Sequence, residues 1–170
     1  MTGLLLDTKL APEQREFAET IRTSAEALLT IINDILDFSK IEAGKLELES
    51  QPFDLRACIE VALDLLAAKA AEKKLDVAYE MDDDIPARLC GDVTRLRQVL
   101  VNLLSNGIKF TSMGEVVVQV EVLAAPDPGQ QRPEPWQLHF LVRDTGVGIP
   151  VDRLTHLFKS FSQADASTAR

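Results

Sequence analysis

Two asparagines and one lysine are spaced along the sequence so that they can act on one ligand. They belong to the stretch RLRQVLVNLLSNGIKFT, residues 95–111. On a helix, Asn102 and Asn106 lie four residues apart on one face, and Lys109 follows three residues later. Amide oxygens are neutral ligands that suit Mg²⁺, and a lysine ammonium can reach phosphate oxygens. The alternative is that both asparagines cap the helix or face water.

A glycine-rich turn, DTGVGIP at residues 144–150, follows a strand-like segment. Gly146 and Gly148 allow the backbone to approach a flat ligand closely. The carboxylate of Asp144, which we expect to be buried, can accept a hydrogen bond from an amino group. Adenine presents such a group, whereas guanine presents a carbonyl at the same place. Taken alone, the motif could equally be an ordinary glycine turn.

A third segment, LFKSFSQAD, covers residues 157–165. Phe158 and Phe161 are spaced to anchor a loop against the rest of the domain. By itself this segment could be a plain amphipathic turn. Together, in this order and spacing, the three segments favour one binding site over three unrelated structural features.

The elements that position these residues begin with a long helix, predicted from residue 12 to residue 43. Pro12 suits a first helical turn, and no further Pro or Gly occurs before Gly44. At about 48 Å this helix would be too long for a small domain to cover. We expect another helix, from a second subunit, to cover a seam with steps of four and three, formed by Phe17, Ile21, Ser24, Leu28, Ile31, Ile35 and Phe38. The alternative is an amphipathic helix that lies on its own domain.

The remaining sequence alternates helix and strand signals. Pro52 marks a domain boundary, and Asp54 and Asp92 can each cap a helix. The predicted elements are a strand at 46–50, a helix to about 74, a strand at 76–81, a helix to 108, and two strands at 115–123 and 136–143 that form an antiparallel hairpin. Their sum is an α+β fold, an α/β two-layer sandwich with a mixed sheet, preceded by a long dimerising coiled-coil helix.

Composition excludes several kinds of partner. The 27 acidic and 18 basic residues leave a net charge of -9, which argues against nucleic-acid and anionic-membrane surfaces. Cys58 and Cys90 have neither a close partner nor histidine at ligand spacing, so we expect two buried thiols in a reducing cytosol. No apolar stretch is long enough to span a bilayer, and no signal peptide opens the chain. We expect a cytoplasmic protein without a membrane segment, which is compatible with a membrane-anchored full-length parent.

The three motifs resemble those of the sensor histidine kinases of two-component signalling, especially the kinases that occur in hybrid form. NLLSNGIKFT is similar to the N box of that family, DTGVGIP to its first glycine box and LFKSFSQAD to its phenylalanine box. The segment IINDILDFSKIEAGKLELE, residues 31–49, resembles the second helix of the family's dimerisation and phosphotransfer hairpin. The resemblance covers nearly the whole chain.

The resemblance implies a Bergerat-type fold of the GHKL ATPase group, with ATP and Mg²⁺ as cofactors. Residues 1–51 would form a partial dimerisation and histidine phosphotransfer helix, and residues 52–170 the ATP-binding domain. Magnesium and a lysine would neutralise charge on the transferring phosphoryl group. The implied roles are Mg²⁺ binding for Asn106, phosphate contacts for Asn102 and Lys109, adenine recognition for Asp144, shaping of the adenine pocket for Gly146 and Gly148, and a lid for Phe158 and Phe161.

Two departures from the family pattern concern the ends of the sequence. The acceptor histidine and its motif would precede residue 1, and the second glycine box would follow Arg170. His139 falls on the polar face of a strand and His156 just before the phenylalanine box, so neither has acceptor context. We therefore assign no catalytic residue. We expect a truncated chain that binds ATP more weakly and does not phosphorylate itself.

The implied function is that of the catalytic-core part of a sensor histidine kinase. In the complete protein it would bind Mg·ATP and pass the γ-phosphate to a histidine and on to a response-regulator aspartate. The expected partners are a second copy, through residues 12–43, and a response-regulator receiver domain, with no nucleic acid. The alternative is a non-catalytic dimerisation and interaction module derived from such a kinase. A gyrase-like ATPase is disfavoured, because Asn102 stands where those enzymes have a water-activating glutamate.

Overall fold

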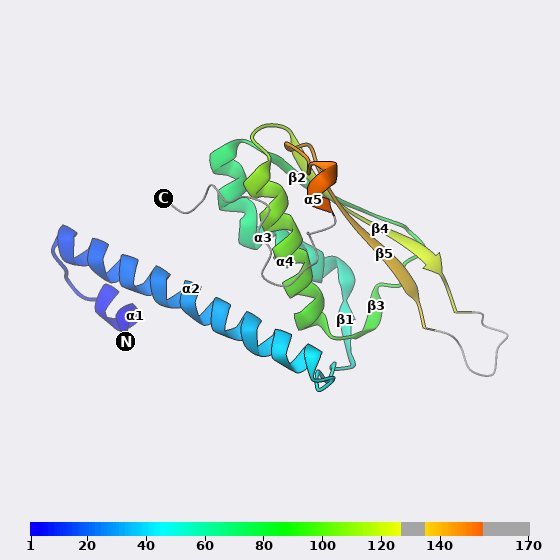
Figure 1. The fold of residues 1–170 in the computed structure, drawn as a ribbon, viewed down its shortest axis with the longest axis horizontal. Helices are drawn as coiled ribbons and strands as arrows, with labels where there is room; N and C mark the ends of the chain where they lie inside the picture. The colour runs from blue at the N-terminus through cyan, green and yellow to red at the C-terminus, as the bar shows by residue number, and fades with distance from the viewer. Residues whose placement is uncertain (127–134, 155–170) are drawn as a thin grey trace. The chain divides into compact units, whose positions relative to one another are not determined.

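The computed structural model describes residues 1–126 and 135–154 and divides the chain into two compact units, residues 1–48 and residues 49–170. Their helices and strands are labelled in Figure 1. Among the residues described, no helix combines the length and the apolar character that crossing a bilayer would need.

The first unit consists of a short helix, α1 (Thr2–Leu6), and a long helix, α2 (Pro12–Glu42) (Figure 1). Pro12 stands in the first turn of α2, where its missing N–H costs no hydrogen bond. The Gln14 side chain reaches back and accepts a hydrogen bond from the Ala11 N–H at 3.1 Å. The long helix predicted from the sequence is therefore confirmed.

The end of α2 follows the glycine signal in the sequence. Gly44 has a φ of 64°, and the Lys45 N–H bonds back to the Lys40 carbonyl at 2.8 Å. At the other end, α1 packs against α2 with Leu6 and Ala18 buried. This short helix is not among the elements predicted from the sequence.

The second unit contains the strands. In chain order its elements are β1 (Gln51–Asp54), α3 (Leu55–Lys73), β2 (Asp76–Met81), β3 (Arg88–Gly91), α4 (Val93–Phe110), β4 (Glu115–Ala124), β5 (Gln137–Asp144) and α5 (Val151–Leu154). Three strands form a sheet in the order β2-β4-β5, with β2 parallel to β4 and β4 antiparallel to β5. β1 and β3 form a separate antiparallel pair. The predicted mixed sheet and the β4–β5 hairpin are confirmed.

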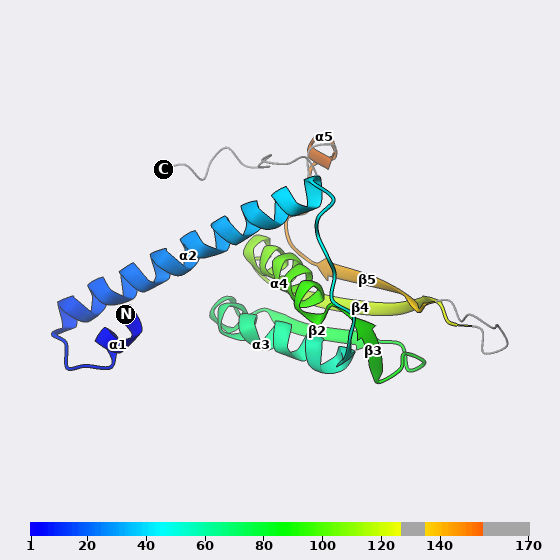
Figure 2. The ribbon, with the colours of Figure 1, turned by 90° about the horizontal axis from the view of Figure 1, so that it is seen from below.

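Helices α3 and α4 lie side by side on one face of the three-stranded sheet (Figure 2). Both begin at a predicted cap: Asp54 accepts a hydrogen bond from the Ala57 N–H, and Asp92 accepts one from the Arg95 N–H, each at 3.0 Å. The core lies between helices and sheet, where alternate residues of β4 are fully buried: Val116, Val118 and Val120. The α/β two-layer sandwich is therefore confirmed.

Two sequence-based predictions about the second unit are wrong. The predicted strand at residues 46–50 does not form, and the strand of this region is β1, which includes Pro52. A proline is tolerated there because β1 has one ladder neighbour, β3, a strand that was not predicted. Of the two thiols expected to be buried, Cys58 is buried but Cys90 is exposed. Strand alternation in β3 turns Leu89 inward and Cys90 outward.

Candidate functional site

The exposed face of α4 carries both asparagines and the lysine of the predicted site. Asn102, Asn106 and Lys109 are exposed at steps of four and three, while the opposite face of the helix is buried in the core. The Lys109 Nζ lies 4.9 Å from the centre of the Phe110 ring, within the range of a cation–π contact. Phe110 is 44% exposed and adds an aromatic surface that the sequence analysis did not single out. Its position four residues after Asn106 was the available signal.

Gly107 allows α4 to approach the sheet closely beside this exposed face. A Cβ at Gly107 would lie 3.0 Å from Val116 Cγ1 on β4 and 3.6 Å from the Cβ of Asp144 at the end of β5. Gly107 is itself buried. The absent side chain thus sets Asp144 beside the turn of α4 that carries Asn106.

Gly146 brings the glycine turn onto the C-terminal end of α4. A Cβ at Gly146 would lie 2.6 Å from the Phe110 carbonyl oxygen and 2.9 Å from Thr111 Oγ1. Within the turn, the Gly146 N–H donates to Asp144 Oδ1 at 2.9 Å. The Val147 N–H donates to the Phe110 carbonyl at 3.4 Å. Only glycine fits at this position, because a backbone carbonyl cannot move aside as a flexible side chain can.

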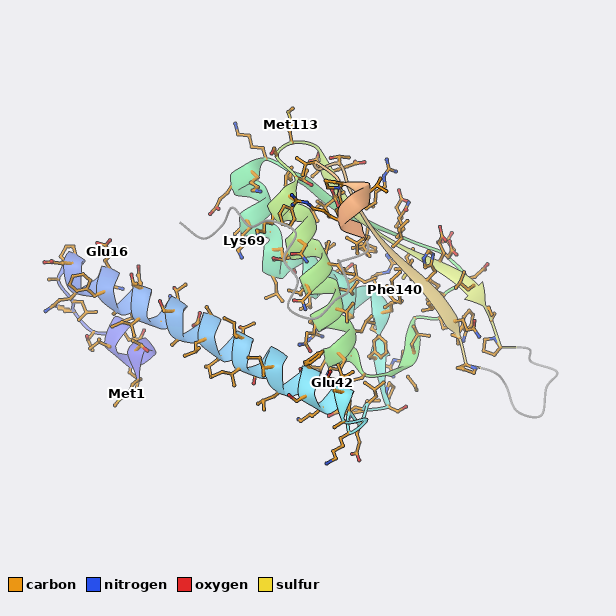
Figure 3. All side chains as sticks on the ribbon, in the orientation of Figure 1. Met1, Glu16, Glu42, Lys69, Met113 and Phe140 are labelled. Atoms are coloured by element: carbon orange, nitrogen blue, oxygen red, sulfur yellow. The ribbon has the colours of Figure 1, made fainter. Side chains whose placement is uncertain are left out.

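A second set of hydrogen bonds joins the same turn to the loop that follows α4. The Thr145 hydroxyl accepts from the Glu115 N–H at 3.0 Å and donates to the Met113 carbonyl at 3.4 Å. The Thr145 N–H donates to the Glu115 carbonyl at 3.2 Å. Gly114, with a φ of 113°, lies so close that a Cβ there would collide with Thr145 Oγ1. Figure 3 shows Met113 projecting outward from this loop.

Two residues of the predicted site have open surroundings. Asp144 is exposed, so the expectation of a buried carboxylate is wrong for the chain without a ligand, because β5 ends at this residue. Gly148 has a φ of 67°, and no described atom lies within 4 Å of the position of its Cβ.

Three further residues singled out in the sequence fall on the part of the chain that the structure does not describe, and a fourth lies on β5. Phe158, Phe161 and His156 lie outside the described residues. His139 is exposed on β5, directly opposite Glu121 on β4, and its Nδ1 lies 3.5 Å from Glu121 Oε2.

The side chains brought together suit a nucleotide. A carboxylate acceptor stands beside a turn that contains two glycines, and an exposed helix face presents amides, an ammonium and an aromatic ring. Within residues 1–126 and 135–154, no cluster of three or more His, Cys, Asp or Glu could hold a metal ion.

Two family matches cover most of the chain. Residues 91–170 match the family described as "Histidine kinase-, DNA gyrase B-, and HSP90-like ATPase", and residues 1–44 match "His Kinase A (phospho-acceptor) domain". The fold and the motifs therefore define an ATPase domain of the Bergerat type preceded by a helical histidine kinase segment.

Known relatives match this chain over nearly its whole length. Hybrid signal transduction histidine kinase A of Dictyostelium discoideum is 42% identical over 170 residues, which are 100% of this chain and 8% of the relative. The structure of full-length ShkA in complex with AMPPNP matches at a TM-score of 0.75 and 33% identity, over 97% of this chain and 33% of that chain. ThkA in complex with the response regulator TrrA shares the fold, with a TM-score of 0.61 at 23% identity over 92% of this chain and 42% of that chain.

The chain belongs to the two-component sensor histidine kinases. It spans 8% to 18% of the length of the first curated relatives it matches.

Proposed function

We propose that the chain binds Mg·ATP at this site and, within a complete kinase, presents the γ-phosphate for transfer to a histidine and on to a response-regulator aspartate. The observation that carries the proposal is the joining of two motifs far apart in sequence. Gly107 lets α4 pack closely against the strands, beside Asp144, and Gly146 lets the Asp144 turn pack against the C-terminal end of α4. The match to the ATPase family and the AMPPNP bound to ShkA support a nucleotide as the ligand.

The Asp144 turn would bind the base. Asp144 Oδ1 is held by the Gly146 N–H, which orients the carboxylate to accept a hydrogen bond from the amino group of adenine. Both glycines would shape the adenine pocket: Gly146 lets the turn pack on the end of α4, and no described atom lies within 4 Å of a Cβ at Gly148, which allows a flat ring to approach the backbone. The exposed ring of Phe110 adds an apolar surface at the same end of α4. This arrangement favours adenine over guanine.

The face of α4 would bind the phosphates. Lys109 and Asn102 would contact phosphate oxygens, and the amide oxygen of Asn106 would bind Mg²⁺. Magnesium, when bound, neutralises charge on the phosphoryl group in transfer. Asn102 is a neutral amide that cannot activate water as a carboxylate would, which favours transfer over hydrolysis. Phe158 and Phe161 are proposed to form the lid of the site.

We assign residues 1–51 to dimerisation and phosphotransfer and residues 52–170 to ATP binding. A second copy is proposed to bind along residues 12–43, because α2 exposes a stripe of large apolar side chains, from Phe17 at 58% exposure to Ile35 at 48%. The response regulator bound to ThkA supports a receiver domain as the other partner, which would place the chain in the cytoplasm. We expect no self-phosphorylation of this chain, because His139 is part of a strand, opposite Glu121, and not of a dimerisation helix.

The alternative is a dimerisation and interaction module that performs no chemistry. The exposed stripe of α2 would serve that function equally well. The two functions differ in one requirement: a kinase core needs magnesium-dependent ATP binding, and an interaction module does not.

Calorimetric titration of the chain with ATP and GTP, with and without magnesium, tests the proposal. ATP should bind at least about tenfold more tightly than GTP, because a carboxylate facing the guanine carbonyl loses a hydrogen bond. Asp144→Ala should abolish this preference. Asp144→Asn can keep the bond from the Gly146 N–H while it exchanges one acceptor for a donor, so it should narrow or invert the preference. Glu121→Gln, an exposed change on β4, is the control.

The possible outcomes separate the two functions. Equal binding of ATP and GTP by the unmodified chain would refute adenine recognition by Asp144. Complete absence of magnesium-dependent ATP binding would favour the interaction module.

A further inference from the structure

The last residue of α3, Lys73, closes the C-terminal end of α4. Its ammonium donates hydrogen bonds to three backbone carbonyls, those of Ile108 at 2.7 Å, Lys109 at 2.8 Å and Thr111 at 3.3 Å. A helix leaves its last four carbonyls without partners inside the helix, and its C-terminus attracts positive charge. Lys73 satisfies both needs at this helix end.

The other carbonyls at the end of α4 have partners as well. The Gly107 carbonyl accepts from the Thr111 N–H at 3.0 Å, and the Phe110 carbonyl accepts from the Val147 N–H at 3.4 Å. The last four carbonyls of α4 are therefore divided among the helix cap, Lys73 and the glycine turn of the proposed site. A change at any of these partners acts on the same helical turn.

The way α3 ends sets the position of Lys73. Lys74 adopts the left-handed conformation, with φ 55° and ψ 41°, and its N–H bonds to the Ala71 carbonyl at 3.0 Å. The Leu75 N–H bonds to the Ala70 carbonyl at 3.0 Å, and both of these residues are buried. This is the Schellman arrangement with its apolar contact, and it stops α3 directly after Lys73.

The helix end that Lys73 holds is also the surface against which the glycine turn packs. Gly146 lies against the last carbonyl of α4 and the hydroxyl of Thr111, which is fully buried. The Gly146 N–H in turn holds the carboxylate of Asp144. Lys109, the proposed phosphate ligand, is one of the residues whose carbonyl Lys73 binds. One ammonium therefore connects the proposed base-binding and phosphate-binding groups.

We propose that Lys73 is a positioning residue of the nucleotide site. By holding the last turn of α4, it sets Lys109 and the Asp144 turn at the separation that one nucleotide requires. This inference rests on the proposed function, because it concerns the same site. A lysine that only stabilised the fold would change the unfolding temperature and leave the selectivity of the folded site unchanged.

Lys73→Met tests the inference, because it keeps most of the apolar stem and removes the ammonium. Binding of Mg·ATP and Mg·GTP is measured by calorimetry well below the unfolding midpoint. Lys73→Met should weaken ATP binding about tenfold and narrow the ratio of ATP to GTP affinity. Lys73→Arg should keep most of the ATP affinity and most of the ATP to GTP ratio, since a guanidinium can also donate to several carbonyls. Lys69→Met, at an exposed position one turn earlier on α3, should leave the ATP affinity and the ATP to GTP ratio unchanged (Figure 3).

Unchanged ATP affinity and an unchanged ATP to GTP ratio in Lys73→Met would overturn the inference, even if that variant unfolds at a lower temperature. If Lys73→Met does not fold, Lys73→Gln, which keeps a shorter neutral donor, decides the matter. Weaker ATP binding by Lys73→Gln supports the inference, and unaltered binding overturns it. If the unmodified chain does not bind Mg·ATP, the proposed function itself fails and the inference falls with it. If the unmodified chain binds Mg·ATP and Lys73→Met binds it with the same affinity and the same ATP to GTP ratio, the inference alone is rejected.

Discussion

The α-carbon of Gly146 faces the carbonyl oxygen of Phe110 so closely that a methyl group on it would lie 2.6 Å from that oxygen. The same carbonyl accepts the Val147 N–H at 3.4 Å. The backbone of the glycine turn is therefore in direct contact with the last carbonyl of α4. A displacement of either the turn or the helix end changes the distance between Asp144, which is proposed to bind the base, and the phosphate-binding residues of α4.

Gly146→Ala should impair both folding and nucleotide binding more than Gly148→Ala does. A methyl group at residue 146 meets a backbone carbonyl and should cost about 1–3 kcal/mol of stability. At residue 148 no described atom lies within 4 Å of a Cβ, and the left-handed φ of 67° opposes alanine by about 1 kcal/mol. Thermal unfolding and ATP calorimetry on both variants measure the difference. Equal losses in the two variants would show that the close approach to Phe110 does not matter.

Lys74→Gly should stabilise the second unit by about 0.5–1 kcal/mol. Lys74 adopts a left-handed φ of 55° at the end of α3, a conformation that glycine reaches without steric cost. Lys69→Gly, inside the same helix, is the matched control and should destabilise by about 1 kcal/mol. Urea unfolding of both variants provides the measurement. A loss of stability in Lys74→Gly would mean that the Lys74 side chain stabilises the fold by more than its left-handed backbone conformation destabilises it.

Leu28→Asp combined with Ile35→Asp should convert a self-associating chain into a monomer. Leu28 and Ile35 are about half exposed on α2, at 58% and 48%. A charge at either position could not be buried against a second helix without a large desolvation cost. Analytical ultracentrifugation measures the change, with Thr30→Asp, away from the seam, as the control. A monomeric unmodified chain at high micromolar concentration would contradict self-association through α2.

Acid should weaken the N-terminal cap of α4. The hydrogen bond from the Arg95 N–H is the largest cause that lowers the pKa of the Asp92 carboxyl below its ordinary value. Desolvation opposes it, and a weaker bond from the Glu49 N–H adds to the lowering. A lowered pKa in the folded state means that the stabilisation is fully present above the unfolded pKa, near 3.9, and is lost as pH falls through the lower folded value. Unfolding midpoints should therefore fall more steeply below about pH 4 in the unmodified chain than in Asp92→Asn, whose amide still caps the helix. Parallel pH profiles for the two chains would show that this carboxyl has the same pKa folded and unfolded.

Much of the fold could be predicted because its signals are local. Pro12 and Gly44 bracket α2, and Asp54 and Asp92 begin the helices that they were expected to cap. The alternation of valines along β4 indicated which side chains are buried, since successive residues of a strand point to opposite faces. The three motifs, with their order and spacing, were sufficient to suggest the family.

The tertiary structure alone decided how the motifs meet. The sequence contains no sign that Lys73 would bind carbonyls of α4, that Gly107 and Gly146 would let the helix and the turn touch, or that Pro52 would pair in a strand with β3. Each of these depends on two segments far apart in the chain, and the partner atoms are mostly backbone groups that every residue carries. Such contacts leave no periodic or compositional signal. They arise only when the packing of α3 and α4 on the sheet brings those particular backbone atoms together.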